Sequence, residues 1–257
     1  VDDMLTRGSV NMYMFVGGTN FGFTSGANHY ETFAPDVTSY DYDALLTECG
    51  DVTPKYMAVR EVIARHTGKA LLPVPPDRPK VAYCKVHAVA STGLFDNLDN
   101  LSVPITLQVP KCMEDCNAGY GYIVYKSKLN RDYDDVKLTF MEIGDRAQVY
   151  VGDNYVGTVY VNDPPYEVTF SAKAGDVLTI VCENMGRTNF GPKMMRKKGI
   201  VGRTLIDGKI HFGWQAYPLP MDNLDKLQWN KKTHTYGEIF YKFVFEIAET
   251  PCDTFLR

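Results

Sequence analysis

RAQVYVGDNYVGTVYV, residues 146–161, decides the fold class of this chain. Valine and tyrosine alternate with other residues along it, and Gly152-Asp153-Asn154 interrupts the pattern in the middle. Alternating β-branched and aromatic residues on both sides of a short turn of Gly, Asp and Asn are typical of antiparallel strands. The stretch therefore predicts two neighbouring strands of an antiparallel sheet.

Similar runs stand on both sides of this stretch, and short turns such as Ala174-Gly175-Asp176 separate them. Their spacing predicts an antiparallel β-sandwich or jelly roll over residues 95–205. A further strong strand is expected at 237–249, as the start of a second, truncated β-domain in 206–257 that offers it no partner strand. The other runs are YGYIVYKSKL (120–129), VKLTFMEI (136–143), YEVTFSA (166–172) and DVLTIVCEN (176–184).

The first 68 residues follow a different pattern. Residues 2–7 predict the last turns of a helix that ends at Gly8, and NMYMFVG (11–17) predicts a strand buried on both faces. Thr53 and Pro54 predict the start of a second helix, which Gly68 ends. The order of helix, strand, long loop and helix predicts the tail of an α/β architecture. A proline-rich linker with a connecting strand is expected over residues 69–94.

A long acidic loop lies between the predicted strand and the second helix, and residues 11–51, which include the strand, carry six carboxylates and no Lys or Arg. Gly17, Gly18 and Asn20 open it, and their spacing fits a sharp backbone turn rather than a phosphate-binding loop. In SYDYD, Asp41 and Asp43 alternate with Tyr42, so an extended backbone would place both carboxylates on one face. They are candidates for a general acid–base pair or, as we favour, for holding the loop by accepting backbone N–H bonds.

Composition excludes several classes of function. The chain has 257 residues and a net charge of only −4, and the absence of a basic run argues against nucleic-acid binding. No apolar run is long enough for a membrane-spanning helix. The five histidines show no ligand spacing, so we expect no metal and no cofactor.

Two short motifs concern covalent chemistry. Cys112 and Cys116 in KCMEDCN are expected to form a disulfide or to remain two free thiols. Asn100 begins the triplet Asn-Leu-Ser, which is an acceptor sequence for N-glycosylation and also arises by chance. The triplet favours a lysosomal or secreted location.

Several long segments, in this order, resemble one known family. They are similar to the end of the catalytic barrel and the following β-domains of family-35 glycoside hydrolases, the β-galactosidases of the lysosomal acid type. The resemblance covers nearly the whole chain and is weakest over residues 87–118. The segments are NMYMFVGGTNFGF (11–23), TSYDYDALLTECGD (38–51), KYMAVREVI (55–63), GYGYIVYKSKL (119–129), DRAQVYVGDNYVGTV (145–159), CENMGRTNFGP (182–192) and IFYKFVFEIAETPCDTFL (239–256).

The resemblance implies a multidomain α/β plus all-β protein, in which the tail of a TIM barrel at 1–68 precedes the β-domains. It also implies a retaining exo-β-galactosidase that uses two glutamates, and both of these would lie upstream of residue 1. We therefore expect no catalytic residue within this chain and no activity of the chain alone. Tyr13 and Tyr42, with Tyr40 as a weaker candidate, are expected to line the galactose pocket. A tyrosine at position 13 is otherwise a core residue of the predicted strand.

The expected partners are a β-galactoside and the upstream portion of the barrel, either covalently joined or as a processed chain. The sequence leaves a homo-oligomer open. The alternative functions are a non-catalytic carbohydrate-binding module and a structural subunit derived from a β-galactosidase-like protein. The acidic rim of the loop fits a neutral sugar better than an anionic one.

Overall fold

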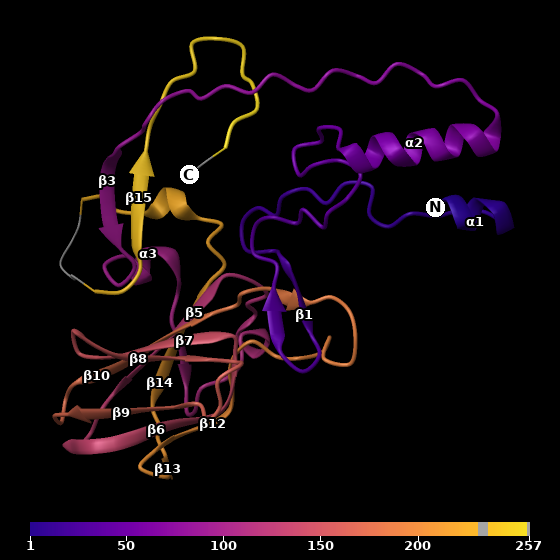
Figure 1. Ribbon diagram of the computed structural model, residues 1–257. Helices are drawn as coiled ribbons and strands as arrows, with labels where there is room; N and C mark the ends of the chain where they lie inside the picture. The colour runs from indigo at the N-terminus through magenta and orange to yellow at the C-terminus, as the bar shows by residue number, and fades with distance from the viewer. Residues whose placement is uncertain (231–235, 256–257) are drawn as a thin grey trace. The chain divides into compact units, whose positions relative to one another are not determined.

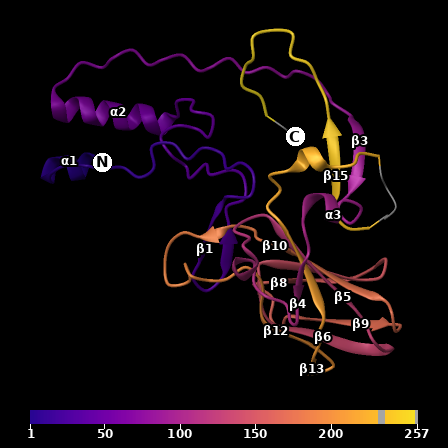
Figure 2. The same ribbon diagram turned by 180° about the vertical axis from the view of Figure 1, so that it is seen from behind.

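The computed structural model describes residues 1–230 and 236–255. In it, two antiparallel sheets form a sandwich. Figure 1 and Figure 2 show the sandwich from opposite sides. The larger sheet has the strand order β4-β14-β5-β10-β7-β8, and the smaller has the order β13-β12-β6-β9. The predicted antiparallel β-sandwich is confirmed. Its strands are β4 Ile105–Leu107, β5 Tyr122–Lys128, β6 Tyr133–Gly144, β7 Arg146–Val151, β8 Asn154–Tyr160, β9 Glu167–Ala172, β10 Val177–Glu183, β12 Gly199–Ile206, β13 Lys209–Ile210 and β14 Trp214–Leu219.

The stretch that predicted two strands forms β7 and β8, which pair in antiparallel register across the turn at Gly152. Alternate side chains of β10 face the core between the sheets, where Leu178 and Ile180 are completely buried. Side chains of β6 and β12, such as Leu138 and Ile200, meet them from the smaller sheet. Apolar side chains on alternate positions of both sheets therefore exclude water from a single core.

A second apolar cluster covers the other face of the larger sheet. Val124 and Val181 point away from the core and pack with Leu94, Leu98 and other residues that precede the sandwich in the chain. The larger sheet is thus covered on both faces, which explains why β10 is a nearly continuous run of buried residues rather than an alternating one. The covering segments include the helix α3 Leu98–Leu101 and Leu227, which directly follows the 3-10 helix η2 Leu224–Lys226. A further 3-10 helix is η1 Glu114–Cys116.

Two expectations about the C-terminal part are wrong. The sandwich does not end at residue 205, because β14 lies between β4 and β5 in the larger sheet. The strand expected to lack a partner is β15 Ile239–Phe243, and it pairs in antiparallel register with β3 Ala88–Gly93. A strand needs a neighbour for its backbone N–H and C=O groups, and the segment before the sandwich supplies it.

The middle of the acidic loop belongs to the sandwich unit. Residues 22–37, which we call the finger, cluster with 87–244, whereas the chain on both sides of the finger belongs to a second compact unit. The finger contains a hairpin of β1 Gly26–His29 and β2 Phe33–Pro35, and β1 also pairs in parallel with β11 Arg187–Thr188. The sequence pattern predicted only a loop here.

The second unit comprises residues 1–21, residues 38–86 and the C-terminal segment from Phe245 onward. Its helices are α1 Asp2–Arg7 and α2 Pro54–Thr67, and both helices predicted for this part of the chain are confirmed. Thr53 caps α2 by accepting the N–H of Tyr56, and Gly68 ends the helix in the left-handed conformation.

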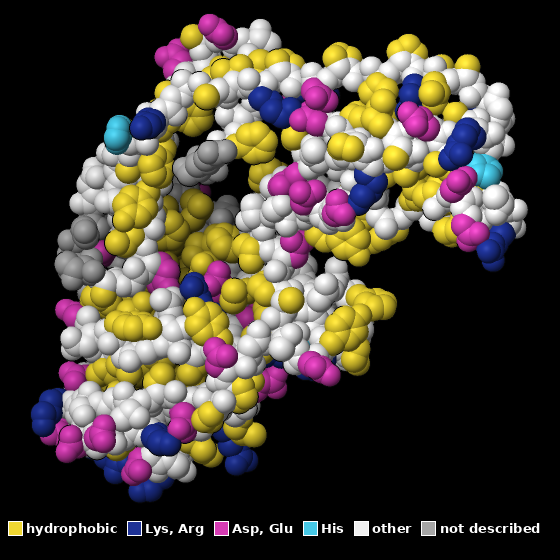
Figure 3. Space-filling view, viewed as in Figure 1, with side chains coloured by type: hydrophobic (Ala, Val, Ile, Leu, Met, Phe, Trp, Pro, Cys, Tyr) yellow, Lys and Arg dark blue, Asp and Glu magenta, His cyan; other side chains and the backbone are white. Residues whose placement is uncertain are grey.

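The predicted buried strand at 11–17 is wrong. These residues form no strand, and Tyr13, Phe15 and Val16 are exposed to solvent. A strand buried on both faces requires neighbours on both sides, and no strand of the described residues pairs with this segment. Figure 3 shows hydrophobic, acidic and basic side chains together on the surface of this unit.

No helix of residues 1–230 and 236–255 is long and apolar enough to cross a membrane.

Candidate functional site

Tyr13 lies together with Tyr40 and Tyr42 of the acidic loop. The ring centroid of Tyr42 is 6.2 Å from that of Tyr13, edge to face, and 5.4 Å from that of Tyr40. Tyr13 is 77 % exposed and Tyr42 is 58 % exposed, so neither ring is a core residue. All three come from the second compact unit, which we call the N-terminal unit, and we call the three residues the tyrosine cluster. Exposed aromatic rings with a hydroxyl group offer both a stacking face and a hydrogen-bonding tip.

The backbone at the cluster turns rather than running extended. Tyr42 and Asp43 have φ angles of 49° and 47°, in the left-handed region, and residues 42–43 form a turn. The expected alternation of Tyr42 with two carboxylates on the opposite face is therefore wrong. Asp43 pairs with Lys55 Nζ at 2.6 Å, across the start of α2. No side-chain hydrogen bond of Asp41 is found among the described residues.

Two short segments, residues 18–20 and 38–40, close the loop at its base, and we call them the neck. Asn20 N–H donates to the carbonyl oxygen of Thr38 (2.7 Å), and Tyr40 N–H donates to that of Gly18 (3.0 Å). The neck thus holds Tyr40 at its edge. Thr19 and Ser39 also form an antiparallel bridge.

Glu48 clamps the two sides of the neck. One carboxylate oxygen accepts the Thr19 hydroxyl at 2.5 Å and the other accepts the Ser39 hydroxyl at 2.7 Å. These two hydrogen bonds, that from Thr19 first, lower the pKa of Glu48. Glu48 is thus the loop carboxylate that holds the two neck segments together through their side chains.

Two glycines at the start of the loop lie where the backbone passes close to the backbone of Tyr40. A Cβ atom at Gly17 would lie 1.5 Å from the carbonyl oxygen of Tyr40, so no larger residue fits there. Gly18 adopts a φ of 86°, which a glycine accommodates without strain. Gly17 and Gly18 therefore permit the close passage that brings Tyr40 to the neck.

A cavity of about 480 Å³ lies in the same unit but at another place. Phe15, Leu46, Tyr56 and Arg78 are among the residues that line it, and none of the three tyrosines does. Its lining is a mixture of apolar groups and a few charges. We assign this cavity no role in sugar binding, because the tyrosine cluster contributes no side chain to its lining.

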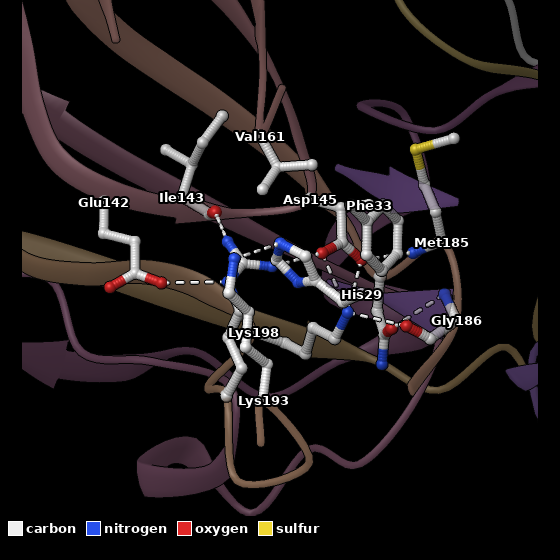
Figure 4. Close-up of polar contacts among 12 residues, drawn as sticks. His29, Phe33, Glu142, Ile143, Asp145, Val161, Met185, Gly186, Lys193 and Lys198 are labelled. Atoms are coloured by element: carbon white, nitrogen blue, oxygen red, sulfur yellow. Dashed lines mark hydrogen bonds and ion pairs between the residues drawn. The ribbon is translucent and has the colours of Figure 1, made fainter. Parts of the chain in front are cut away.

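A buried ionic cluster joins the finger to the sandwich (Figure 4). Lys198 Nζ donates to both oxygens of Asp145, at 2.8 and 2.6 Å, and to the carbonyl oxygen of Gly186 at 2.6 Å. Arg196 donates to the same carboxylate at 2.8 Å, and the backbone N–H of Met185 donates to it at 3.0 Å. Burial lowers the pKa of Lys198, and the charge of Asp145 opposes that shift.

His29 of the finger lies beside this cluster. Its Nε2 is 3.1 Å from Lys193 Nζ, and its Nδ1 is buried without a partner among the described residues. Burial is the main cause that lowers the pKa of His29, and the positive charges of Lys193 and Arg196 add to it. The lowered pKa favours the neutral imidazole. Asp145 is the one group among the named causes that acts in the opposite direction.

Two family models match this chain. "Glycosyl hydrolases family 35" matches residues 1–66, and "Beta-galactosidase, first all-beta domain" matches residues 110–220. The chain is thus similar to family-35 glycosyl hydrolases over residues 1–66 and to β-galactosidases over residues 110–220. The tyrosine cluster lies within the first matched segment, and the ionic cluster lies on the second.

Curated proteins named as β-galactosidases or β-galactosidase-like are similar over most of this chain. A "Beta-galactosidase" of Xanthomonas manihotis is 37 % identical over 257 residues, which cover 96 % of this chain and 42 % of that protein. The "Beta-galactosidase-1-like protein 2" of Homo sapiens is 36 % identical, covering 97 % and 40 %. A "Beta-galactosidase" of Bos taurus is 37 % identical, covering 86 % and 34 %. The chain thus spans less than half the length of these relatives.

The remaining candidate residues serve no chemistry that the structure reveals. Cys112 and Cys116 are both free thiols in the core, and burial raises the pKa of Cys112 to about 11. The expected disulfide is therefore replaced by the other alternative, two free thiols. Asn100 lies half-buried in α3, and its amide donates to Asn97 Oδ1 at 3.2 Å. No cluster of metal-ligating side chains occurs in residues 1–230 and 236–255.

The finger and the Glu48 clamp had no signal that sequence reasoning could use. Glu48 is one of several acids in the loop, and its partners lie far away in the sequence at Thr19 and nearby at Ser39. Lys198 follows Arg196 and Lys197, and lysine side chains are ordinarily solvated, yet that of Lys198 is 1 % exposed. Only the approach of Asp145 makes that burial tolerable.

Proposed function

We propose that the protein containing this chain is a retaining exo-β-galactosidase that hydrolyses terminal β-galactosyl residues. The match of residues 1–66 to the family-35 model and the names of the curated relatives support this proposal. The observation that carries it within the chain is the tyrosine cluster, in which the exposed rings of Tyr13 and Tyr42 and the half-buried ring of Tyr40 lie together at the base of an acidic loop.

In this proposal the loop supplies one wall of a galactose pocket. The apolar face of a galactose ring would stack on a tyrosine ring, and the tyrosine hydroxyls would hydrogen-bond the sugar hydroxyls. The acids of the loop would favour a neutral sugar over an anionic one. They would also stabilise the positive charge that develops on the oxocarbenium-like transition state.

The chemical steps are assigned to two glutamates outside this chain, as the family resemblance implies. One would attack the anomeric carbon, and the other would protonate the leaving oxygen and later activate water. Residues 1–68 would then be the tail of a TIM barrel, with the acidic loop at the carboxyl face where such barrels bind substrates. Other parts of the barrel would be the partner of this segment, and no cofactor enters the mechanism.

The proposed location is lysosomal or secreted, and it rests on Asn100 as a glycosylation site. Mass analysis of the native glycoprotein before and after removal of N-linked glycans would test this. An unmodified Asn100 would remove the support for the location without affecting the proposed reaction.

Conservative substitutions in the full-length protein test the galactose pocket. Tyr42→Phe and Tyr13→Phe should each weaken competitive inhibition by galactose, because a lost hydroxyl bond costs about 0.5–1.5 kcal/mol, or roughly 2- to 12-fold in affinity. Tyr241→Phe is the matched control, since Tyr241 on β15 is 56 % exposed, close to the value for Tyr42. Unchanged galactose inhibition in both cluster variants would contradict the placement of the pocket wall.

The chain alone should not hydrolyse a chromogenic β-galactoside, because the proposal assigns no catalytic residue to it. Turnover by the purified chain that galactose inhibits would overturn this assignment and direct attention to Asp41 and Asp43. Binding of galactose without turnover, in the full-length protein as well, would favour the carbohydrate-binding alternative.

A further inference from the structure

The finger belongs to the sandwich unit, whereas the chain before it and after it belongs to the N-terminal unit. Residues 22–37 cluster with the sandwich, and residues 18–20 and 38–40 on either side form the neck in the N-terminal unit. Tyr40 and Tyr42 follow the finger directly in the sequence. Because only a few peptide bonds separate the finger from these two tyrosines, conformational freedom of the finger backbone also increases the conformational freedom of Tyr40 and Tyr42.

Backbone contacts hold the finger at its first strand. β1 pairs in parallel with β11, with Gly26 opposite Arg187 and Ala27 opposite Thr188. Arg187 N–H donates to the carbonyl oxygen of Ser25 at 3.1 Å. The approach is close, because a Cβ atom at Gly186 would lie 2.4 Å from the carbonyl oxygen of Gly26.

One side chain of the sandwich unit holds the second strand of the finger. The Asn162 amide accepts the backbone N–H of Phe33 through Oδ1 and donates to the carbonyl oxygen of Phe33 through Nδ2, both at 2.8 Å. A single asparagine thus satisfies both backbone groups of one residue, as a neighbouring strand would. Asn162 itself is exposed, so its side chain has no part in the sandwich core.

The side chains of the finger add an aromatic and ionic contact. The Phe33 ring is 4 % exposed, and Lys198 Nζ lies 4.6 Å from its centroid. His29 packs against the same ring, with centroids 5.4 Å apart. The buried Lys198–Asp145 pair therefore touches the finger directly, and Figure 4 shows His29 and Phe33 on either side of it.

We propose that the β-sandwich positions the sugar-facing tyrosines by anchoring the finger, with Asn162 and Lys198 as positioning residues for Tyr40 and Tyr42. The inference rests on the proposed galactose pocket for its functional consequence and on the hydrogen bonds of Phe33 for its structural part. Anchoring both strands of the finger removes conformational freedom from the neck before a ligand arrives, so less ordering remains to oppose binding. The sandwich thereby acts in substrate recognition without contacting the sugar.

The test compares Asn162→Ala with Asp163→Ala in the full-length protein. Asp163 is the adjacent exposed residue, and no side-chain hydrogen bond or ion pair of Asp163 is found among the described residues, so it controls for substitution in this turn. The first measurement is hydrogen exchange of the Phe33 amide in the finger and of the Asn20 and Tyr40 amides in the neck. The second is KM, kcat and galactose inhibition with a chromogenic β-galactoside.

Asn162→Ala should speed exchange of the Phe33 amide at least about tenfold, and that of the neck amides by a smaller factor. It should raise KM and the galactose inhibition constant about 3- to 10-fold, with a smaller change in kcat, while Asp163→Ala changes none of these. Unchanged exchange at Phe33 would overturn the anchor. Faster exchange at Phe33 with unchanged exchange in the neck would overturn the positioning.

Faster exchange at both places with unchanged KM and galactose inhibition would also overturn the positioning role for sugar binding. If the wild-type protein neither turns over nor binds a β-galactoside, the proposed function fails. The exchange rates still decide whether the sandwich orders the neck, so the two failures are distinguishable.

Discussion

Lys198 Nζ lies 2.6 Å from Oδ2 of Asp145, and the two side chains are 1 % and 0 % exposed. The carboxylate accepts two further donors, from Arg196 and from the backbone of Met185. A charge without its partner is costly at such a site, because water cannot reach it. The pair therefore makes the local structure sensitive to the loss of either member, whatever its net contribution to stability.

Replacing Lys198 by Met should destabilise the sandwich unit by about 3–5 kcal/mol, since it leaves the buried Asp145 carboxylate short of one cation. Lys137→Met is the control. Lys137 lies 2.6 Å from Glu167 across neighbouring strands, but its side chain is 62 % exposed. The control should change the free energy of unfolding by about 0–1 kcal/mol. Denaturant unfolding of both variants measures the difference, and equal effects would contradict the proposed burial of the pair.

The pKa of His29 is lowered below 6.5, so its contribution to stability is present above the unfolded pKa and is lost as pH falls through the folded pKa. Lys193, Arg196 and Lys198 oppose the added proton, and Asp145 favours it. Glu142 forms an ion pair with Arg196, with Oε1 2.9 Å from Nε. Protection factors of the finger amides should therefore decrease as pH falls below about 6.5.

His29→Asn removes the titrating group and should remove most of this pH dependence. Exchange should be followed between about pH 7 and pH 5, with intrinsic rates corrected for pH. Amides of β10 in the sandwich core provide the internal control. A finger whose protection in the wild type does not change with pH would contradict the role assigned to His29.

Periodicity was sufficient to predict most of the sandwich, because strands such as β6 and β10 span 12 and 7 residues and β10 buries alternate side chains such as Leu178 and Ile180 in the core. The helix at 54–67 was also predictable, since Thr53 and Gly68 mark its two ends. Both kinds of signal are local. They depend on residues that are neighbours in the sequence.

The finger could not be predicted in this way. Phe33 is held by Asn162, and Gly26 is paired with Arg187, so the partners lie far apart in the sequence. The apolar run at 11–17 misled for a related reason, because an apolar segment becomes a strand only where a neighbouring strand is present. The clustering of Tyr13 with Tyr40 and Tyr42 likewise depends on the neck, and no local sequence pattern predicts the hydrogen bonds that form the neck.

Glu238 should respond to pH in the opposite sense to His29. Both of its side-chain oxygens are buried without a hydrogen-bond partner among the described residues, and burial raises its pKa above 4.5. Its stability contribution is present below the unfolded pKa and is lost as pH rises through the folded pKa. Glu238→Gln should therefore stabilise the unit at pH 7 and have little effect at about pH 4.

Thermal unfolding of Glu238→Gln at the two pH values tests this prediction. Glu183→Gln is the matched control, because Glu183 pairs with Arg146 at 2.5 Å and its substitution should destabilise at pH 7. Stabilisation by Glu238→Gln of the same size at both pH values would show that burial of the charge is not its cause.

The N-terminal unit should be the first part of the isolated chain to be cleaved by a protease. Neither α1 nor α2 has a buried residue, and Ala44 and Leu45 are the buried hydrophobic residues among the described part of this unit. At roughly 25 cal/mol per Å² of buried apolar surface, such a unit has little to offset its conformational entropy. The sandwich, with its continuous core, has much more.

Trypsin should therefore cut at Lys55, Arg60 and Arg65 in α2 well before it cuts at Lys126 or Lys173 in the sandwich. The finger adds a second expectation. The fragment from residue 8 to residue 55 contains the finger, so it should remain bound to the sandwich fragment under native conditions and separate from it only in denaturant. Size-exclusion chromatography followed by mass spectrometry would measure both results. An α2 that resists trypsin as long as the sandwich would contradict the low stability of the N-terminal unit. Prompt release of the 8–55 fragment would contradict the anchoring of the finger.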